Sequence, residues 1–387
     1  MELFDKYVIA NYTRLPVVVV RGEGSRIWDA DGREYMDFFP GWAVSGIGHC
    51  HPLVVKRVRD QVANLMHVAN NFYMEPQGLL AREISEHSFG GKCFFCNSGA
   101  EAVEAALKLA RKYTPRGRYK IISMENSFHG RTFAAITATA QPKYHEGFEP
   151  LPAGFVYVPF NDLAAVEDAL DDETAAVIVE PIQGEGGINV AADDYLEGIR
   201  ALCDENGVVL IFDEVQTGMG RTGEYFGYQH SGVVPDIMTM AKSLGGGAAI
   251  GAIAAKPEVA AAMVPGSHAS TFGGNPLACA AGLGVFEAIE KEGLIENARE
   301  MGAYLRGKLE ALGEKYAFVR EVRGKGLMLG MELDMPGAGI VSRCLEKGLN
   351  INCTHDTVLR VMPAMIVTRD EIDAGVEIID SSLAGES

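Results

Sequence analysis

Long apolar runs are missing from this sequence. No stretch of 18 consecutive apolar residues occurs, and no basic segment followed by an apolar one stands after Met1. A membrane-spanning helix needs about 20 mostly apolar residues, and a secretory signal needs a basic start ahead of an apolar segment. We therefore predict no membrane span and no signal peptide, and we expect a cytoplasmic protein.

Basic residues are also few. The chain has 34 lysines and arginines against 52 aspartates and glutamates, which gives a formal net charge of −18 at pH 7. Nucleic acids and anionic membrane surfaces bind proteins through basic faces. The charge balance therefore argues against both as partners and favours a soluble protein that acts on small molecules.

Cysteines are few, odd in number and dispersed. The seven of them stand at positions 50, 93, 96, 203, 279, 344 and 353. This pattern fits free thiols in a reducing compartment better than a disulfide framework. Cys93 and Cys96 have the spacing of a redox motif, but they lie inside an apolar segment and no second pair completes a zinc site. His49-Cys-His51 lacks a fourth ligand, so we predict a turn before Pro52 and no metal site.

Nucleotide-binding loops are absent from the place where an α/β protein needs them. No Gly-x-Gly-x-x-Gly or Walker-type run follows the first strand of the expected sheet, which disfavours a nucleotide-binding protein. Internal repeats and low-complexity linkers are absent as well. With 387 residues, 48% of them hydrophobic, the chain is long enough for a large core and more than one domain.

The informative segments begin with residues 208–216. Residues 208–212 are apolar and the run ends abruptly in Asp213, which is typical of a buried parallel strand whose carboxyl end opens into a site. A carboxylate there needs a cationic partner, because burying an unpaired charge is costly. A second apolar segment, residues 235–242, ends in Lys242. An ordinary ion pair between Asp213 and Lys242 is one interpretation, and a reactive pair at a ligand site is the other.

Two further segments favour a ligand site. An expected strand runs into Ser98 and Gly99 and then into a helix over residues 102–112, and backbone amides at such a helix start bind phosphate. Another expected strand is followed by Phe128 and Arg131, an aromatic ring and a cation. An acid, a lysine, a phosphate cradle and an aromatic ring together suit a flat, cationic, phosphorylated heterocycle that carries an aldehyde. We therefore predict pyridoxal 5'-phosphate as the cofactor.

Seven short motifs occur along the chain in one order. They are Gly48-His-Cys-His-Pro52, Asn97-Ser-Gly-Ala-Glu101, Phe128-His-Gly-Arg-Thr132, Glu180-Pro-Ile-Gln-Gly-Glu185-Gly, Phe212-Asp-Glu-Val-Gln216-Thr-Gly, Ala241-Lys242 and Ser270-Thr-Phe-Gly-Gly-Asn-Pro276. Through them the chain resembles the class III pyridoxal-phosphate-dependent aminotransferases, and most closely the acetylornithine aminotransferases, from about Asn11 to about Ile379. One such motif is weak evidence, whereas seven in the family's order are specific.

The resemblance implies an α/β fold of the aspartate-aminotransferase type (fold type I). Its large domain has a mixed, mostly parallel sheet, and its smaller domain is α+β. We predict an N-terminal segment over residues 1–50 that belongs to the small domain, a large cofactor-binding domain over 51–275, and a C-terminal part of the small domain over 276–387.

The spacing of apolar residues predicts individual elements that agree with this fold. A strand over 175–180, a helix over 193–205 and the strand that ends in Asp213 form a βαβ crossover. A hairpin is expected around Asp31-Gly32, and a helix over 52–66. Further helices over 277–291 and 295–312 precede the strands of a smaller sheet.

The resemblance also assigns roles around the cofactor. Lys242 matches the lysine that binds the cofactor aldehyde and later moves a proton, and Asp213 matches the acid that keeps the pyridine nitrogen protonated; these two are the expected catalytic residues. Gln216 is expected to hydrogen-bond the phenolic oxygen, with Val215 and Phe128 on the two faces of the ring. For Val215 and Phe128, ordinary core packing is the alternative interpretation.

Phosphate binding is expected from Gly99 and Ala100 through their backbone amides, with Ser98 nearby. In the family a threonine that matches Thr271 reaches the phosphate from the partner subunit, and Ser270 is expected to approach the substrate from there too. The resemblance therefore implies a homodimer whose active sites lie at the interface.

Three charged residues match the family's substrate contacts. Arg131 resembles the arginine that binds the α-carboxylate of acetylornithine, and Arg360 the one that binds the α-carboxylate of glutamate or 2-oxoglutarate. Glu185 resembles the acid that pairs with this second arginine while the ω-amino substrate is bound. The planar guanidinium fits a carboxylate with two hydrogen bonds. An exposed position on a strand is the alternative for Arg360.

Two positions depart from the family pattern. Val103 stands where these enzymes commonly have asparagine, so any hydrogen bond from that side chain is lost. Trp42 stands where acetylornithine enzymes usually have a small aliphatic residue and ornithine enzymes a tyrosine. Since a tryptophan there narrows the pocket or stacks on the substrate amide, we include Trp42 among the expected substrate-binding residues.

The predicted reaction is transfer of the terminal amino group of N-acetylornithine, or of a close ω-amino acid, to 2-oxoglutarate, as in arginine biosynthesis. Ornithine, 4-aminobutyrate and a lysine-pathway intermediate stay open as donors. A cofactor-binding regulator without turnover is the alternative from another class, and it is disfavoured because Lys242, Asp213, Arg131 and Arg360 are all present.

Overall fold

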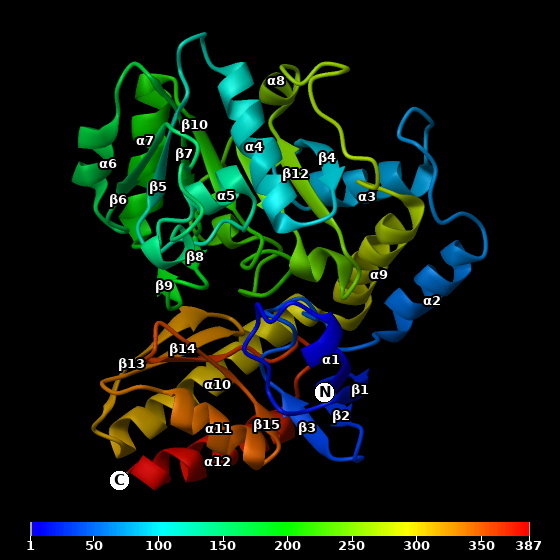
Figure 1. The fold of residues 1–387 in the computed structure, drawn as a ribbon, viewed down its shortest axis with the longest axis vertical. Coiled ribbons are helices and arrows are strands. Elements are labelled where there is room, and N and C mark those ends of the chain that lie inside the picture. The colour runs from blue at the N-terminus through cyan, green and yellow to red at the C-terminus, as the bar shows by residue number, and fades with distance from the viewer. Residues whose placement is uncertain (1, 387) are drawn as a thin grey trace.

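The computed structural model describes residues 2–386, which form two bodies that face each other (Figure 1). The upper body in that view contains a seven-stranded sheet, and we call it the sheet region, from α2 (Pro52–Val62) to α9 (Pro276–Glu292). The lower body contains both chain ends, and we call it the end region, made of residues 2–51 and 293–386.

The seven-stranded sheet is mixed and mostly parallel. Its strands, in spatial order, are β4 (Lys92–Cys96), β12 (Gly251–Ala255), β11 (Ile237–Met240), β10 (Val209–Asp213), β7 (Thr174–Val179), β5 (Lys120–Met124) and β6 (Phe155–Val158). Only β12 runs against its two neighbours. All five residues of β10 are buried, because helices cover both faces of the sheet. The predicted fold class is confirmed.

The predicted βαβ crossover is present at the centre of this sheet. β7 leads into α7 (Asp193–Asn206) and then into β10, which pairs with β7 in parallel. The helix ends at Gly207, whose φ of 60° is the left-handed conformation that glycine adopts without a Cβ penalty. The carboxyl end of β10 therefore delivers Asp213 to the edge of the sheet where ligands bind in α/β folds.

Two predicted helices have different ends in the structure. The helix expected from residue 102 is α4 (Gly99–Tyr113), which begins earlier because the Ser98 hydroxyl accepts a hydrogen bond from the Glu101 amide at 3.2 Å. α2 stops at Val62 instead of continuing to residue 66. The remaining helices of the sheet region are α3 (Glu75–Glu86), α5 (Phe133–Ala138), α6 (Leu163–Ala169) and α8 (Pro257–Ala260).

The first sheet of the end region joins the two ends of the chain. β1 (Val19–Glu23), β2 (Arg26–Asp29) and β3 (Glu34–Asp37) are antiparallel, and they include the predicted hairpin around Asp31-Gly32. The fourth strand, β15 (Leu349–Asn350), comes from the other end of the chain and pairs with β3 in parallel.

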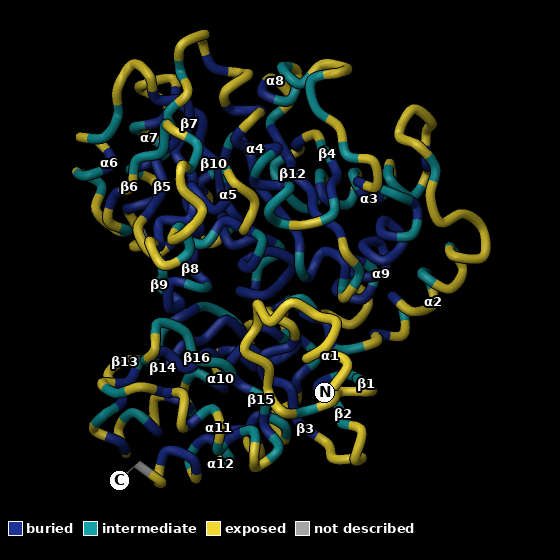
Figure 2. Tube along the Cα trace, in the orientation of Figure 1, coloured by how far each residue is buried: buried dark blue, intermediate teal, exposed yellow. Residues whose placement is uncertain are grey.

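A second four-stranded sheet carries the remaining C-terminal strands. Its order is β13 (Val319–Lys325), β14 (Met328–Leu333), β17 (Val358–Val361) and β16 (Asn352–Thr354). The helices here are α10 (Leu294–Lys315), α11 (Ala338–Glu346) and α12 (Arg369–Leu383), besides the short α1 (Glu2–Tyr7). α1 buries none of its residues and is exposed along its length in Figure 2. Among residues 2–386, no helix has the length and apolar character to cross a membrane.

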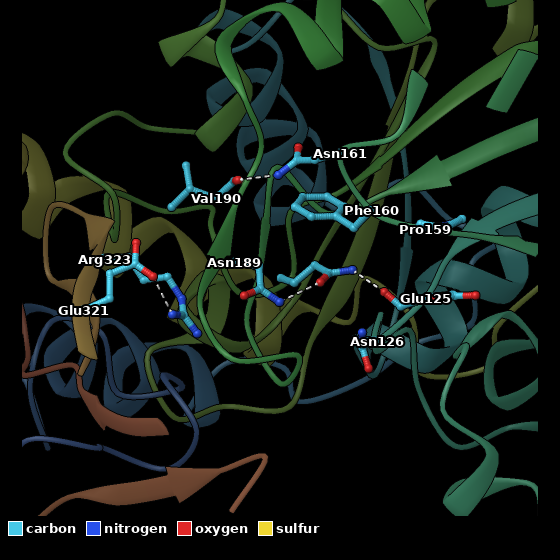
Figure 3. Close-up of a pocket in the computed structure, with 10 residues that line it drawn as sticks. Glu125, Asn126, Pro159, Phe160, Asn161, Asn189, Val190, Glu321 and Arg323 are labelled. Carbon is cyan, nitrogen blue, oxygen red and sulfur yellow. Dashed lines mark hydrogen bonds and ion pairs between the residues drawn. The ribbon is translucent and has the colours of Figure 1, made fainter. Parts of the chain in front are cut away.

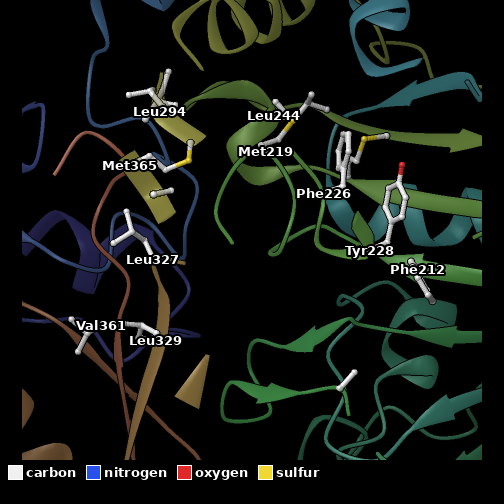
Figure 4. Packing of buried hydrophobic residues seen from close by; sticks show 14 of the residues in the cluster. Phe212, Met219, Phe226, Tyr228, Leu244, Leu294, Leu327, Leu329, Val361 and Met365 are labelled. Carbon is white, nitrogen blue, oxygen red and sulfur yellow. The ribbon is translucent and has the colours of Figure 1, made fainter. Parts of the chain in front are cut away.

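The two regions share one apolar core. Buried side chains follow one another from Phe212 and Phe226 in the sheet region to Leu327 and Val361 in the end region (Figure 4). The backbones also approach closely at this junction, since a Cβ on Gly326 of the end region would lie 2.4 Å from the backbone of Thr222 in the sheet region. The end region is therefore packed against the sheet region without room for an additional methyl group at this point.

Candidate active site

A cavity of about 430 Å³ opens at the carboxyl ends of β10 and β11. Ten of the residues predicted from the sequence line it together: Ser98, Gly99, Ala100, Phe128, Arg131, Glu185, Asp213, Val215, Gln216 and Lys242. They come from segments up to 144 positions apart in the sequence (98 to 242), so the fold gathers them. Charged groups and apolar walls in one cavity are typical of a ligand site.

Lys242 follows β11 directly and has a backbone φ of 46°. This left-handed conformation is rare for a residue with a Cβ and often marks a functional position. Burial lowers the pKa of the Lys242 amine, while the Glu185 carboxylate acts in the opposite direction and the Arg360 guanidinium lowers it further. A lowered pKa leaves more of the amine unprotonated, which is the state of a nucleophile or a base.

Asp213 is fixed by hydrogen bonds on both carboxylate oxygens. Oδ1 accepts from the Val215 amide at 3.1 Å and from the Thr239 hydroxyl at 2.9 Å. Oδ2 lies 2.7 Å from Nδ1 of His129. Within the described chain, Asp213 forms no salt bridge with Lys242. The simple ion pair between these two residues was therefore the wrong alternative, and the side chain that meets Asp213 Oδ2 is the imidazole of His129.

Glu180 supports the same wall from the end of β7. Its carboxylate accepts hydrogen bonds from the amides of Phe128 at 2.9 Å and Gly184 at 3.1 Å. Burial raises the pKa of Glu180 to about 7. Glu180 thus ties the Phe128 segment to the loop that carries Glu185.

Groups without a protein partner fit the predicted cofactor. Gln216 Oε1 is buried and has no hydrogen-bond partner among residues 2–386, so it is available to a hydroxyl or amine of a ligand. The first amides of α4 also point out of the helix start, where they lack intrahelical acceptors. At the start of α4, a Cβ on residue 99 would lie 3.0 Å from the Val215 side chain. The absence of a Cβ at Gly99 therefore allows the helix start to pack closely against Val215. An anion-binding helix start, a free amide oxygen and a buried amine suit a phosphorylated aldehyde.

Arg131 is held by aromatic rings. Its guanidinium carbon lies 4.1 Å from the ring centre of Tyr144 and 5.5 Å from that of Phe128. No hydrogen bond or salt bridge to Arg131 is present among the described residues, and the side chain is exposed to the cavity. Cation–π contacts orient a guanidinium without neutralising its charge, so Arg131 stays available to a carboxylate.

Arg360, in contrast to Arg131, is buried and paired with a carboxylate. It is buried on β17, and its Nη1 donates to Glu185 Oε1 at 2.6 Å while its Nη2 donates to Glu185 Oε2 at 3.2 Å. Burial raises the pKa of Glu185, but the Arg360 guanidinium outweighs this and holds the pKa below its usual value. The alternative of an exposed strand residue is wrong for Arg360, which is 1% exposed.

Four positions singled out from the sequence lie outside the cavity wall. Trp42 is exposed, and its ring packs edge-on against that of Phe39, with 6.0 Å between the ring centres. Val44, and not Trp42, lines the cavity. Thr271 is exposed, and the Ser270 hydroxyl accepts from the Asn97 amide at 3.1 Å. Val103 is fully buried in the apolar core under α4. At this position, where the family commonly has asparagine, the valine side chain contributes to core packing.

A second cavity, of about 460 Å³, lies between the sheet region and β13 (Figure 3). Its polar side chains bond to their neighbours: Gln183 donates to the Glu125 carbonyl at 2.8 Å, Asn189 to Gln183 at 3.1 Å, and Arg323 to Glu321 at 2.9 Å. None of these lining residues has a buried polar side-chain atom without a hydrogen-bond partner among residues 2–386, whereas Gln216 supplies one in the Lys242 cavity. The Lys242 cavity is therefore the candidate active site.

Sequence reasoning missed several residues of this site. His129 and Glu180 belong to two of the seven motifs and Thr239 to the segment 235–242, but no role was assigned to them, although their positions near strand ends were a usable signal. Tyr144 and Asn352 carry no such signal, because they lie 13 and 8 positions from their arginines and outside every motif.

The chain was compared with known proteins. It matches the family model described as "Aminotransferase class-III" over residues 7–383. It is 55% identical over 384 residues to the acetylornithine aminotransferase of Caldanaerobacter subterraneus subsp. tengcongensis, with 98% of each chain covered. It is 53% identical over 384 residues to the acetylornithine aminotransferase of Methanocaldococcus jannaschii, with 98% of this chain and 96% of the relative covered.

A solved structure extends this similarity to three dimensions. The ornithine aminotransferase from Toxoplasma gondii superposes with a TM-score of 0.95 at 36% identity, covering 100% of this chain and 94% of that one. The similarity in fold is therefore complete across both regions of the molecule.

Proposed function

We infer the reaction of this chain from its family, because the chain belongs to the class III aminotransferases. We propose that it transfers the terminal amino group of N-acetylornithine to 2-oxoglutarate, which yields the semialdehyde and glutamate. The two relatives that are 55% and 53% identical over nearly the whole chain are both named acetylornithine aminotransferase, and this supports the acylated donor.

The observation that carries the proposal is the contrasting state of two arginines. Arg360 is buried and paired with Glu185, whereas Arg131 is exposed to the cavity and touches only rings. A donor whose carboxylate lies far from its reacting amine would bind Arg131 while Arg360 stays paired. 2-Oxoglutarate would replace Glu185 on Arg360, because a carboxylate matches the guanidinium in the same way.

Pyridoxal phosphate supplies an aldehyde that binds amines and a ring that accepts electrons from the substrate carbon. Lys242 would hold this cofactor through its amine and, once released, carry a proton to and from the substrate. Asp213 would hold a proton at the pyridine nitrogen, with His129 and Thr239 fixing the carboxylate.

The remaining wall residues would position the cofactor. Gly99 and Ala100 would bind its phosphate through their amides, with Ser98 beside them. Gln216 would accept from the phenolic oxygen through its unpartnered Oε1. Val215 and Phe128 would lie on the two faces of the ring.

We also propose a homodimer, in which the partner subunit completes each site with its Thr271 and Ser270. Exposed apolar side chains near these residues support an interface: Leu65, Met66, Phe72, Tyr73, Val264 and Phe272. Apolar surface of this kind commonly marks an association face. Sedimentation is expected to give a dimer at assay concentrations, and a stable, cofactor-loaded, active monomer would defeat this part of the proposal.

Two further assignments remain proposals. We propose action in the cytoplasm, which the seven free cysteines support because thiols persist in a reducing compartment. We propose that residues 51–275 form the large domain and that 1–50 with 276–387 form the small one, which the pairing of β15 with β3 supports.

The experiment that tests the reaction is a panel of amino donors. kcat/KM is measured for N-acetylornithine, N-succinylornithine, ornithine, 4-aminobutyrate and an acetyl-lysine-type donor, each with 2-oxoglutarate. We expect acylated donors to exceed free ornithine by about a hundredfold, because a free ammonium at the far end would be buried without a partner. Free ornithine or 4-aminobutyrate at equal or higher efficiency would refute the acetylornithine assignment.

Trp42→Ile in the same panel tests whether the indole contributes to this preference. Because Trp42 lies outside the cavity wall and is 51% exposed, we expect kcat/KM for each donor to change by less than about threefold. A larger change would place the indole in a site completed by the dimer.

A further inference from the structure

The guanidinium of Arg360 is held from two sides by groups of different chemistry. On one side Glu185 supplies a carboxylate, and the neighbouring Gly184 carbonyl accepts from Nη1 at 3.3 Å. On the other side Nε and Nη2 of Arg360 donate to Oδ1 of Asn352 at 2.8 and 2.6 Å. Arginine has only donors, so the contact requires the oxygen of the Asn352 amide. The guanidinium also lies over the ring of Phe39, at 4.6 Å from its centre.

The two anchors come from different parts of the fold. Asn352 is on β16 and stands directly opposite Arg360 on β17, as its cross-strand partner in the same sheet. Glu185 follows the short strand β8 (Ile182–Gln183) in the sheet region, across the junction. Asn352 therefore stays beside Arg360 as long as β16 and β17 are paired. The ion pair between Arg360 and Glu185 can break without loss of any hydrogen bond between these two strands.

This difference matters when a carboxylate substrate replaces Glu185. Without Asn352, Arg360 would lose its last side-chain hydrogen-bond partner when Glu185 leaves, and its side chain would gain rotamer freedom. The substrate would then have to restrict that freedom again. Asn352 keeps two of the guanidinium donors engaged through that exchange. Because an amide is neutral, it orients the arginine and leaves its positive charge to the incoming carboxylate.

We propose that Asn352 is a positioning residue for the keto-acid half of the reaction: it keeps Arg360 aimed at the site while Glu185 gives way to 2-oxoglutarate. The inference rests on the proposed function, in which Arg360 binds the α-carboxylate. It also explains why an asparagine, and not an aspartate, faces this guanidinium, since a second carboxylate would neutralise it permanently.

Two substitutions test this role in the cofactor-loaded enzyme. Asn352→Leu keeps the size of the side chain and removes both hydrogen bonds. Asn352→Asp keeps an oxygen in the same place and adds a charge. Asn350→Ala is the matched control, because Asn350 lies two residues away on β15 and donates to Asp37 at 2.7 Å without a described contact to Arg360.

The two half-reactions are followed separately in single turnovers by the absorbance of the bound cofactor. For both Asn352 variants we expect kcat/KM for 2-oxoglutarate to fall at least about tenfold, with a larger loss for Asn352→Asp. The half-reaction with N-acetylornithine is expected to stay within about threefold of the parent. Glutamate as the donor is expected to lose as much as 2-oxoglutarate, because it carries the same α-carboxylate.

An equal loss in both half-reactions would overturn the inference, since a merely structural asparagine acts on both. A 2-oxoglutarate half-reaction within threefold of the parent in either variant would overturn it as well. If the unmodified enzyme reacts with 2-oxoglutarate and glutamate but not with N-acetylornithine, the proposed function fails instead, and the glutamate readout still tests Asn352.

Discussion

The cofactor side and the carboxylate side of this site are built differently. On the cofactor side, Asp213 and Lys242 stand at the ends of the neighbouring parallel strands β10 and β11 of one sheet, and Asp213 accepts a hydrogen bond from Thr239 of β11. On the carboxylate side, Arg360 comes from a second sheet and meets Glu185 across the junction between the two regions. The geometry of the cofactor side therefore depends on a single sheet, whereas the geometry of the carboxylate side depends on how the sheet region and the end region pack together.

This difference separates chemistry from substrate choice. Groups that must keep a fixed geometry stand at the ends of buried strands, where neighbouring backbones restrain them. The group that must serve two substrates, Arg360, is paired across a boundary with a partner that exchanges. Changes on the cofactor side should abolish turnover with every substrate, whereas changes on the carboxylate side should alter which substrate is used.

The largest effect is expected at Lys242. Lys242→Ala removes both the amine that holds the cofactor and the group that moves the proton, so turnover should fall by at least ~10³-fold with every donor. Lys291→Ala, at an exposed lysine on α9, should retain activity. Borohydride reduction followed by peptide mapping checks the attachment site, and a cofactor-modified lysine elsewhere in Lys242→Ala would contradict the assignment.

Asp213→Asn should come next. A neutral amide keeps the size of the side chain and part of its bonding to Thr239 and His129, but it does not hold a proton on the ring nitrogen. Turnover is expected to fall by ~10²–10³-fold with all donors, while the melting temperature stays close to that of the parent. Steady-state rates and a thermal scan measure the two quantities, and a rate within a few-fold of the parent would remove Asp213 from the mechanism.

A smaller effect is expected inside the end region, which carries Arg360 of the carboxylate side. Gly302→Ala places a methyl group 2.4 Å from the backbone of Gly326, so it should destabilise the fold by ~1–3 kcal/mol. Gly307→Ala is the control on the same helix, where nothing lies within 4 Å of the new Cβ, and it should be neutral or stabilising by up to ~1 kcal/mol. Urea unfolding measures both, and equal stabilities would show that the packing of α10 against Gly326 is looser than the structure indicates.

The sequence predicts the cofactor side of the site better than the carboxylate side. The strand that ends in Asp213 could be predicted because an apolar run that stops at an acid is a local signal, and the parallel sheet and crossover helix around it are confirmed. Ten of the residues expected at the site line one cavity, because they stand at strand ends and helix starts whose geometry local motifs reflect.

The rest depended on contacts that the local motifs do not reflect. His129 beside Asp213 is a pairing 84 positions apart, and Asn352 reaches Arg360 only because β16 and β17 pair in one register. The ends of α2 and α4 differed from prediction because hydrogen bonds at the helix ends, such as the one from the Glu101 amide to Ser98, decide where a helix starts and stops. The roles of Thr271 and Ser270 concern a second subunit and stay predictions.

The exchange at Glu185 is the central claim, and Glu185→Gln measures it most directly. The substitution keeps the shape of the side chain but replaces a charge-assisted pair with Arg360 by a neutral contact, which weakens it by ~1.5 kcal/mol or more. An α-carboxylate then competes for Arg360 more easily, so the ratio of kcat/KM for N-acetylornithine to kcat/KM for glutamate should fall about tenfold or more, with the cofactor still bound. A ratio that stays within twofold of the parent, or rises, would contradict the account in which Glu185 masks Arg360.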